Sequence, residues 1–322
     1  MDVWQFIQHK LNASVRVVLL VVLESEGSSP GRQGFKMAVA ADDTFYGTIG
    51  GGIMEHKLVE KAKQMLIDNV DNIQLMRQYH DKQKASNQSG MICSGSQLNA
   101  FIPVFLSDKS IIEAIKADQL KNLTITSKGI AVTDTPAPDK NFDLRFTSED
   151  DWKYNEKLNH QPIIHIIGGG HVSLALSELM NFLGFYVKVY DDRPALNTME
   201  ENRFADQKFL VEDYQLLGEK IPSSPDDYVV IITFGYRSDK VALKQLLDKN
   251  FAYLGLIGSD KKIQTLFKEL EAEGIAPEKL RSIFAPVGIN IFSRTAPEIA
   301  VSIAAEIIRE KNKELPTGRH GS

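Results

Sequence analysis

The chain has 322 residues, which is enough for two domains of ordinary size. Its hydrophobic fraction of 43% and charged fraction of 25% are typical of a soluble globular protein. A formal net charge of −5 argues against nucleic acid as a partner, because binding many phosphates needs a basic surface. The apolar run 17–23 is too short to cross a bilayer and no secretion signal is evident, so we expect no membrane partner. The single cysteine, Cys93, suits a reducing compartment, which predicts a cytoplasmic protein.

The N-terminal half reads as a mixture of helices and short strands. Apolar spacing predicts a helix over 2–11, and strands at 15–24, 37–41, 45–49, 73–79 and 98–106. Three consecutive glycines, Gly50, Gly51 and Gly52, precede a helical pattern that ends at Ile67. A helix over 111–117 and further short strands are expected before residue 150. Segment 148–160 is the most polar and least patterned, so we divide the chain into domains 1–155 and 156–322.

The C-terminal half opens with a strand, a glycine turn, a helix and a second strand that ends at Asp191. This is the layout of a mononucleotide-binding βαβ unit. Gly168 and Gly170 allow the backbone to turn sharply and approach a phosphate, which the free N–H groups at the helix start then bind. Asp191 is placed to accept hydrogen bonds from ribose hydroxyls, with a solvated loop acid as the alternative. Ser173 replaces the third glycine of the motif and is small enough for close helix–strand packing.

Strands and helices alternate from Pro162 to the last helix, 296–310, which predicts parallel strands joined by right-handed crossovers. The expected fold class is α/β, with a C-terminal Rossmann-like doubly wound parallel sheet and a smaller N-terminal α+β domain. Ligands in such sheets bind beyond the carboxyl ends of the strands. The glycine turn, Asp191, residues 233–235 and residues 258–259 all fall there. This convergence favours a site for a phosphate-bearing ligand.

Three further residues or groups are candidates. His171 lies in the first helical turn beside the expected anion, or is simply an exposed helix-terminal histidine. Gly50, Gly51 and Gly52 with Glu55 form a second possible anion site, although a carboxylate there also fits ordinary stabilisation of the helix dipole. Arg294 could reach a pyrophosphate or carboxylate. Thr295 and Glu298, which follow it, are explained by a capping box.

Five separated pieces of the chain resemble the xanthine dehydrogenase accessory factor (XdhC/CoxI) family. They are residues 26–30 with Gly34, residues 47–52 with Glu55, Cys93, residues 168–172, and residues 286–290 leading to 294–300. The late strand and turn 255–259, with Lys261, is also similar to the family pattern. Family members often carry a cysteine directly after the three glycines, where this chain has Ile53. They often carry histidine in the stretch that reads Thr233 to Asp239 here.

This resemblance implies a molybdenum-cofactor chaperone. Such a protein binds molybdopterin, protects it while a cysteine desulfurase supplies its terminal sulfur, and delivers it to a xanthine dehydrogenase-type molybdoenzyme. The family's members are usually homodimers. The resemblance also implies that Cys93 contacts the molybdenum, since a thiolate is a soft ligand; the alternative is a buried cysteine that acts as a small hydrophobe. We expect the cofactor in the cleft between the domains, with its phosphate at Gly168 and Gly170.

A second hypothesis is an NAD(P)-dependent oxidoreductase, because a Rossmann turn followed by a strand-end acid is a dinucleotide signature. The chain shows no evident proton donor for hydride chemistry, no metal-ligand histidine spacing and no hydrolase motif. We therefore expect a cofactor chaperone rather than an enzyme that turns over a substrate.

Overall fold

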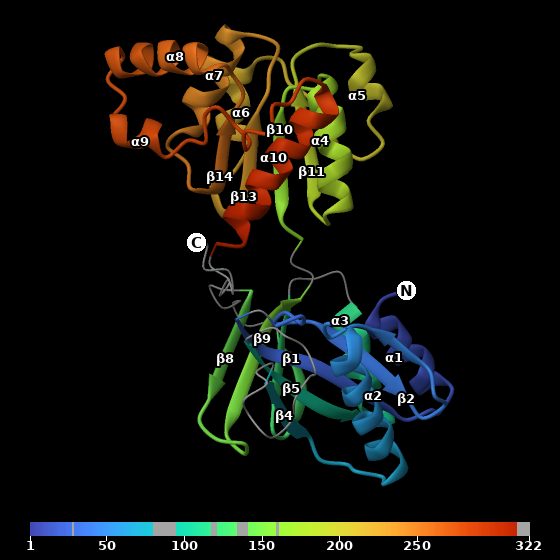
Figure 1. The fold of residues 1–322 in the computed structure, drawn as a ribbon. Coiled ribbons are helices and arrows are strands. Elements are labelled where there is room, and N and C mark those ends of the chain that lie inside the picture. The colour runs from blue at the N-terminus through green and yellow to red at the C-terminus, as the bar shows by residue number, and fades with distance from the viewer. Residues whose placement is uncertain (28, 80–94, 117–120, 134–140, 159–160, 314–322) are drawn as a thin grey trace. The chain divides into compact units, whose positions relative to one another are not determined.

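The computed structural model describes residues 1–27, 29–79, 95–116, 121–133, 141–158 and 161–313 (Figure 1). Contacts between Cα atoms divide the chain into two compact units of nearly equal size, Met1–His160 and Gln161–Glu314. The boundary expected after residue 155 would pass through a strand, Trp152–Leu158. Among the described residues no helix is both long and apolar enough to cross a membrane.

The N-terminal unit is built on a five-stranded antiparallel sheet in the order β3-β2-β1-β5-β4. Its strands are β1 (Val17–Gly27), β2 (Lys36–Ala40), β3 (Phe45–Gly47), β4 (Gln74–Tyr79) and β5 (Gly95–Val104). β1 is central and its residues 17–23 are all buried, because both faces of the sheet are covered. Burial on both faces explains why this strand is a continuous apolar run rather than an alternating one.

Helices cover the two faces of this sheet. They are α1 (Val3–Asn12), α2 (Gly52–Ile67) and α3 (Lys109–Lys116). The short helix η1 (Leu106–Asp108), which directly precedes α3, buries no residue. α2 packs through Leu58 and Ala62 on one face, in a core with Leu20 and Phe101. α1 and α3 contribute to the core on the opposite face. The predicted strand, glycine turn and helix around Gly50 are therefore confirmed as β3 followed by α2.

A second antiparallel sheet joins the core of the α1 face, in the order β7-β6-β9-β8. Its strands are β6 (Lys121–Thr126), β7 (Gly129–Thr133), β8 (Phe142–Phe146) and β9 (Trp152–Leu158). β9 lies in the segment that had the least evident pattern. Its inward residues Trp152, Tyr154 and Leu158 are buried, but Glu156 is the fourth inward residue. Glu156 is held by Lys36 at 2.6 Å and by Tyr154 at 3.0 Å, and this buried carboxylate breaks the apolar alternation.

The C-terminal unit contains a five-stranded parallel sheet in the order β12-β11-β10-β13-β14. Its strands are β10 (Ile163–Ile167), β11 (Tyr186–Asp191), β12 (Gln207–Leu210), β13 (Ser224–Ile231) and β14 (Phe251–Leu256). The chain starts in the centre, builds outward to β12, and then returns to the other side of β10. The reversal between β10 and β13 is the switch point at which Rossmann folds bind their ligands. The predicted α/β class and Rossmann-like sheet are confirmed.

Helices cover both faces of this sheet (Figure 1). Those of the unit are α4 (His171–Phe182), α5 (Asn197–Glu201), η2 (Tyr214–Leu216), α6 (Leu217–Lys220), α7 (Tyr236–Leu246), α8 (Asp260–Ala272), α9 (Pro277–Arg281) and α10 (Ala296–Lys311). α4 and α10 share one apolar core with the sheet, and α6, α7 and α8 share the other. The start of α10 is the expected capping box, with Thr295 and Glu298 in their predicted roles.

Candidate functional site

The glycine turn between β10 and α4 is fixed by close backbone packing. Gly168 has a φ of +108°, and a Cβ atom there would lie 2.4 Å from the carbonyl oxygen of Ile232. Its amide donates to the carbonyl of Tyr190 at 2.7 Å. Gly169 is crowded by Met199, whose Cγ would lie 2.4 Å from an added Cβ. Gly168 is therefore required by the backbone packing of the turn, whereas a side chain at Gly169 would have to displace Met199.

Gly170, by contrast, is open toward solvent. It is the N-cap residue of α4 and has no side-chain cap, and a Cβ there would meet nothing within 4 Å. The first helical bond runs from the amide of Leu174 to the carbonyl of Gly170. The amides of His171, Val172 and Ser173 precede that bond and have no partner within the helix. Together with the helix dipole they favour an anion at this end of α4.

Ser173 supplies an independent indication of a ligand. Its side chain is 0% exposed, yet its hydroxyl has no hydrogen-bond partner among the described residues. A buried hydroxyl without a partner costs about 1–3 kcal/mol by protein mutational data, so such groups are rare unless something binds them. Ser173 also lines the pocket at the start of α4. The position that replaces the third glycine thus offers a hydroxyl for a bound anion.

Asp191, the predicted ribose acid, is engaged within the protein. Its side chain is buried, and one carboxylate oxygen accepts from the Gly169 amide at 2.6 Å and from Arg193 Nη2 at 2.7 Å. The other oxygen accepts from the Arg193 amide at 2.8 Å and from Nε at 2.9 Å. Burial acts to raise the pKa of Asp191, but the hydrogen bonds from Arg193 and Gly169 outweigh it and lower the pKa. A ribose hydroxyl would have to compete with these donors.

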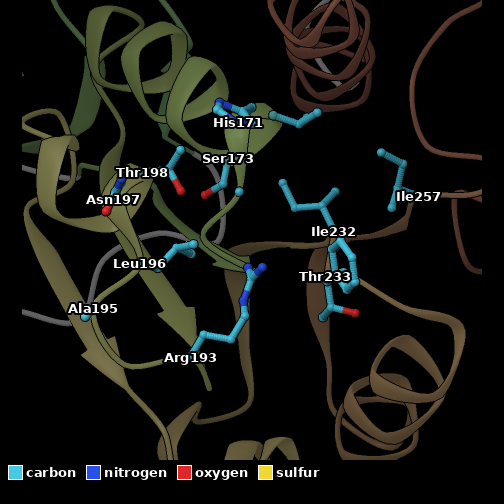
Figure 2. Close-up of a pocket in the computed structure, with 13 residues that line it drawn as sticks. His171, Ser173, Arg193, Ala195, Leu196, Asn197, Thr198, Ile232, Thr233 and Ile257 are labelled. Carbon is cyan, nitrogen blue, oxygen red and sulfur yellow. The ribbon is translucent and has the colours of Figure 1, made fainter.

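A pocket of about 670 Å³ opens at the carboxyl end of the sheet, where α4 begins. Figure 2 shows His171 and Ser173 on α4, the side chain of Arg193 extending from the opposite wall, and Thr233 on a third strand end. The lining also includes Leu196, Asn197, Thr198, Phe234 and Ile257. Its described lining residues include one arginine and one histidine. The Arg193 guanidinium is already paired with the Asp191 carboxylate, so the uncapped start of α4 is the main feature that favours an anion here.

Thr233, which forms part of the pocket wall, is held by hydrogen bonds to a buried carboxylate outside the pocket lining. Its amide and hydroxyl donate to Asp239 at 3.1 Å and 2.6 Å, and Lys262 also bonds to this carboxylate. Asp239 is fully buried, and burial raises its pKa despite the opposing effects of Lys262 and Thr233. This network ties the turn after β13 to α8 and keeps the pocket wall in place.

The amides of the N-terminal glycine loop bind a carboxylate of the protein itself. Gly50, Gly51 and Gly52 all have positive φ values, of 131°, 75° and 71°. The Glu55 carboxylate accepts from the amides of Ile49 at 2.9 Å and Gly51 at 3.0 Å. It therefore occupies donors that an external anion would need. Ile53, at the position often occupied by cysteine in the family, is 62% exposed.

Of the two remaining predicted residues, the structure places only Arg294. Arg294 is exposed just before α10 and does not line the pocket. Cys93 lies outside the described residues, so its predicted contact with molybdenum stays a prediction. Within the described ranges no three His, Cys, Asp or Glu side chains form a group that could hold a metal.

The structure therefore brings Gly170 and His171 together with three residues outside the main prediction, Ser173, Arg193 and Phe234. Two of these carried a signal in the sequence. Arg193 directly follows two acids at a strand end, and Ser173 occupies a motif position. The exposure of Phe234 had no local signal, because it depends on how neighbouring loops pack.

The strand order and the open helix start define a Rossmann-type protein with a pocket at the switch point of its parallel sheet. The C-terminal unit matches the family model described as the XdhC Rossmann domain over residues 164–307. Residues 11–78 match the model of the XdhC and CoxI family. The chain belongs to the XdhC and CoxI family, as its motifs predicted.

Two relatives and one solved structure are similar to most of this chain. A Bacillus subtilis (strain 168) protein, named as a probable xanthine dehydrogenase subunit, is 24% identical over 92% of this chain and 93% of its own length. YqeB of Escherichia coli (strain K12), described as uncharacterised, is 28% identical over 90% of this chain, which spans only 43% of that protein. A Bacillus halodurans protein, titled a xanthine dehydrogenase in its crystal structure, has the same fold. It shows a TM-score of 0.69 and 21% identity, with 98% of this chain and 97% of that chain covered.

Proposed function

We propose that this protein is a molybdenum-cofactor chaperone. It binds the phosphorylated pterin cofactor, holds it while a cysteine desulfurase supplies sulfur, and delivers it to a xanthine dehydrogenase-type molybdoenzyme. Family membership supports the accessory role, and the observation that carries the binding proposal is the unpartnered, buried Ser173 hydroxyl at the uncapped start of α4. We further propose that the protein acts in the cytoplasm as a homodimer.

The residues of the pocket fit the phosphate end of such a cofactor. Ser173 and the first amides of α4 would bind phosphate oxygens, and Arg193 would supply positive charge from the opposite wall. Asp191 acts as a positioning residue, because it fixes the guanidinium of Arg193 through two side-chain hydrogen bonds. The bound cofactor would carry the molybdenum–sulfur chemistry used by the recipient enzyme, while this chain binds and orients it.

A carrier needs reversible binding rather than an acid–base pair. Among the described residues that line the pocket there is no carboxylate, and the one histidine of that set, His171, is exposed at the helix start. An NAD(P)-dependent oxidoreductase remains the comparison hypothesis, since the strand order is that of dinucleotide-binding domains. Its expected ribose acid, Asp191, is already engaged by Gly169 and Arg193, which favours the carrier.

Calorimetry on the purified full chain tests the proposal with molybdopterin cofactor, NAD(H) and NADP(H). The expected result is cofactor binding that is weakened at least tenfold by Gly170→Val, whose branched side chain would fill the space before the helix start. Gly170→Ala, which adds one methyl group in open space, is the matched control. Micromolar dinucleotide binding without cofactor binding would refute the chaperone and favour the oxidoreductase.

A further inference from the structure

Phe234 is an exposed aromatic residue in the wall of the pocket. Its side chain is 90% exposed, although burying a phenylalanine side chain is strongly favourable. It lies between the end of β13 and the start of α7 and lines the same pocket as Ser173 and Arg193. An exposed aromatic ring at the edge of this pocket can make an apolar contact with a bound ligand.

The backbone on both sides of this ring is anchored. Thr233 is bonded to the buried Asp239 through its amide and its hydroxyl. Gly235, on the other side, is the N-cap residue of α7 and accepts the helical bond from the Asp239 amide at 2.9 Å. Phe234 is therefore presented by two fixed neighbours. An anchored backbone lowers the entropy that a ligand must overcome to use the ring.

Arg193 relates the ring to the anion-binding part of the pocket. Its guanidinium carbon lies 5.7 Å from the centroid of the Phe234 ring, within the range of a cation–π contact. The same guanidinium is held by Asp191 through Nε and Nη2. Asp191 therefore connects the glycine turn to Arg193, and Arg193 in turn contacts Phe234 in the loop that follows β13.

We propose that Phe234 is a stacking platform for a planar heteroaromatic ring whose phosphate is bound at the start of α4. The ligand class is a phosphorylated heterocycle, such as a pterin or a purine nucleotide. A phosphate alone would use Ser173 and the helix amides, whereas the ring adds contact with Phe234. Recognition at two points selects against free phosphate and sugar phosphates. The inference deepens the proposed function and rests on it only for the identity of the ring.

The test compares GMP, which has both ring and phosphate, with ribose 5-phosphate, which lacks the ring. Calorimetry is run on the full chain with wild type, Phe234→Ala and Phe234→Tyr. Stacking on an aromatic side chain contributes about tenfold or more to affinity. Phe234→Ala should therefore weaken GMP at least tenfold and ribose 5-phosphate less than twofold, and Phe234→Tyr should restore GMP binding.

Phe182→Ala is the matched control, because Phe182 is 85% exposed at the other end of α4 and does not line the pocket. It should change neither affinity. The platform is overturned if Phe234→Ala lowers the affinity for GMP and for ribose 5-phosphate equally, or leaves the affinity for GMP unchanged. Phe234 would then be better explained as a contact for another protein. Absence of binding of both GMP and molybdenum cofactor to the wild type also overturns it.

A second readout uses Phe234→Trp. The native tryptophans, Trp4 and Trp152, both belong to the N-terminal unit, so the wild type gives the background. GMP should quench the added fluorescence and ribose 5-phosphate should not; equal responses contradict stacking.

If GMP binding depends on Phe234 but the molybdenum cofactor does not bind, the proposed function fails and the platform stands. If the cofactor binds equally well to Phe234→Ala and wild type, the platform fails and the proposed function stands.

Discussion

Ser173→Ala should stabilise the protein and weaken its ligand binding. The Ser173 hydroxyl is 0% exposed and has no partner among the described residues. Ser177, one turn further along α4, is the matched control. It is also 0% exposed, but its hydroxyl accepts from Asn202 Nδ2 at 2.9 Å. The same chemical change in the same helix should therefore have opposite effects on stability.

The magnitudes follow from the state of each hydroxyl. Removing an unpartnered buried hydroxyl relieves a penalty of about 1–3 kcal/mol, less some lost dispersion contacts. We therefore expect Ser173→Ala to raise the free energy of unfolding by ~1 kcal/mol. Ser177→Ala leaves the Asn202 amide without its acceptor and should cost about 1–3 kcal/mol. A hydrogen bond to a charged group contributes about 1.5–3 kcal/mol, so Ser173→Ala should weaken phosphate-bearing ligands about 10–100-fold.

Urea and thermal unfolding of both variants measure the change in stability. Calorimetry with GMP or molybdenum cofactor measures the change in ligand affinity. The expected rise in Tm for Ser173→Ala is about 2–4 °C per kcal/mol for a unit of this size. If Ser173→Ala destabilises the protein as Ser177→Ala does, the hydroxyl has a partner within the protein. Unchanged ligand affinity would remove Ser173 from the site.

Two further substitutions test the framework around the pocket. Gly168→Ala should destabilise the C-terminal unit by more than ~2 kcal/mol, because the residue has positive φ and its Cβ would clash with the Ile232 carbonyl; Gly170→Ala should change stability by under ~1 kcal/mol, and equal urea midpoints would contradict this distinction. Asp191→Asn should cost roughly 2–4 kcal/mol at pH 7, because an amide cannot satisfy four donors. Asp192→Asn, at the exposed neighbour, is its control. Since the folded-state pKa of Asp191 is lowered, its contribution is present above the ordinary value of 3.8 and is lost as pH falls through the lower folded value. Urea titrations at pH 7 and below 3.8 should therefore show the difference between wild type and Asp191→Asn shrinking with acid, and a constant difference would refute the assignment.

Much of the fold could be predicted because its signals are local. The three glycines before α4, the leucine spacing along that helix and the alternation of strands with helices all follow from short-range sterics and periodicity. β9 was not evident as a strand for the opposite reason. Glu156 stands at an inward position, and only its ion pair with Lys36 and its bond from Tyr154 make that burial acceptable. Such compensation comes from residues far away in the chain.

For the candidate site, the sequence by itself determined the class of the turn, the family and the edge of the sheet where a ligand would bind. It could not determine which polar groups remain available there. Asp191 and Glu55 carry the expected charges, but the folded chain uses both carboxylates to bind its own amides. The Ser173 hydroxyl remains available because none of the described residues forms a hydrogen bond with it. Availability depends on where non-adjacent strands and loops place their partners, and that is decided only by the tertiary structure.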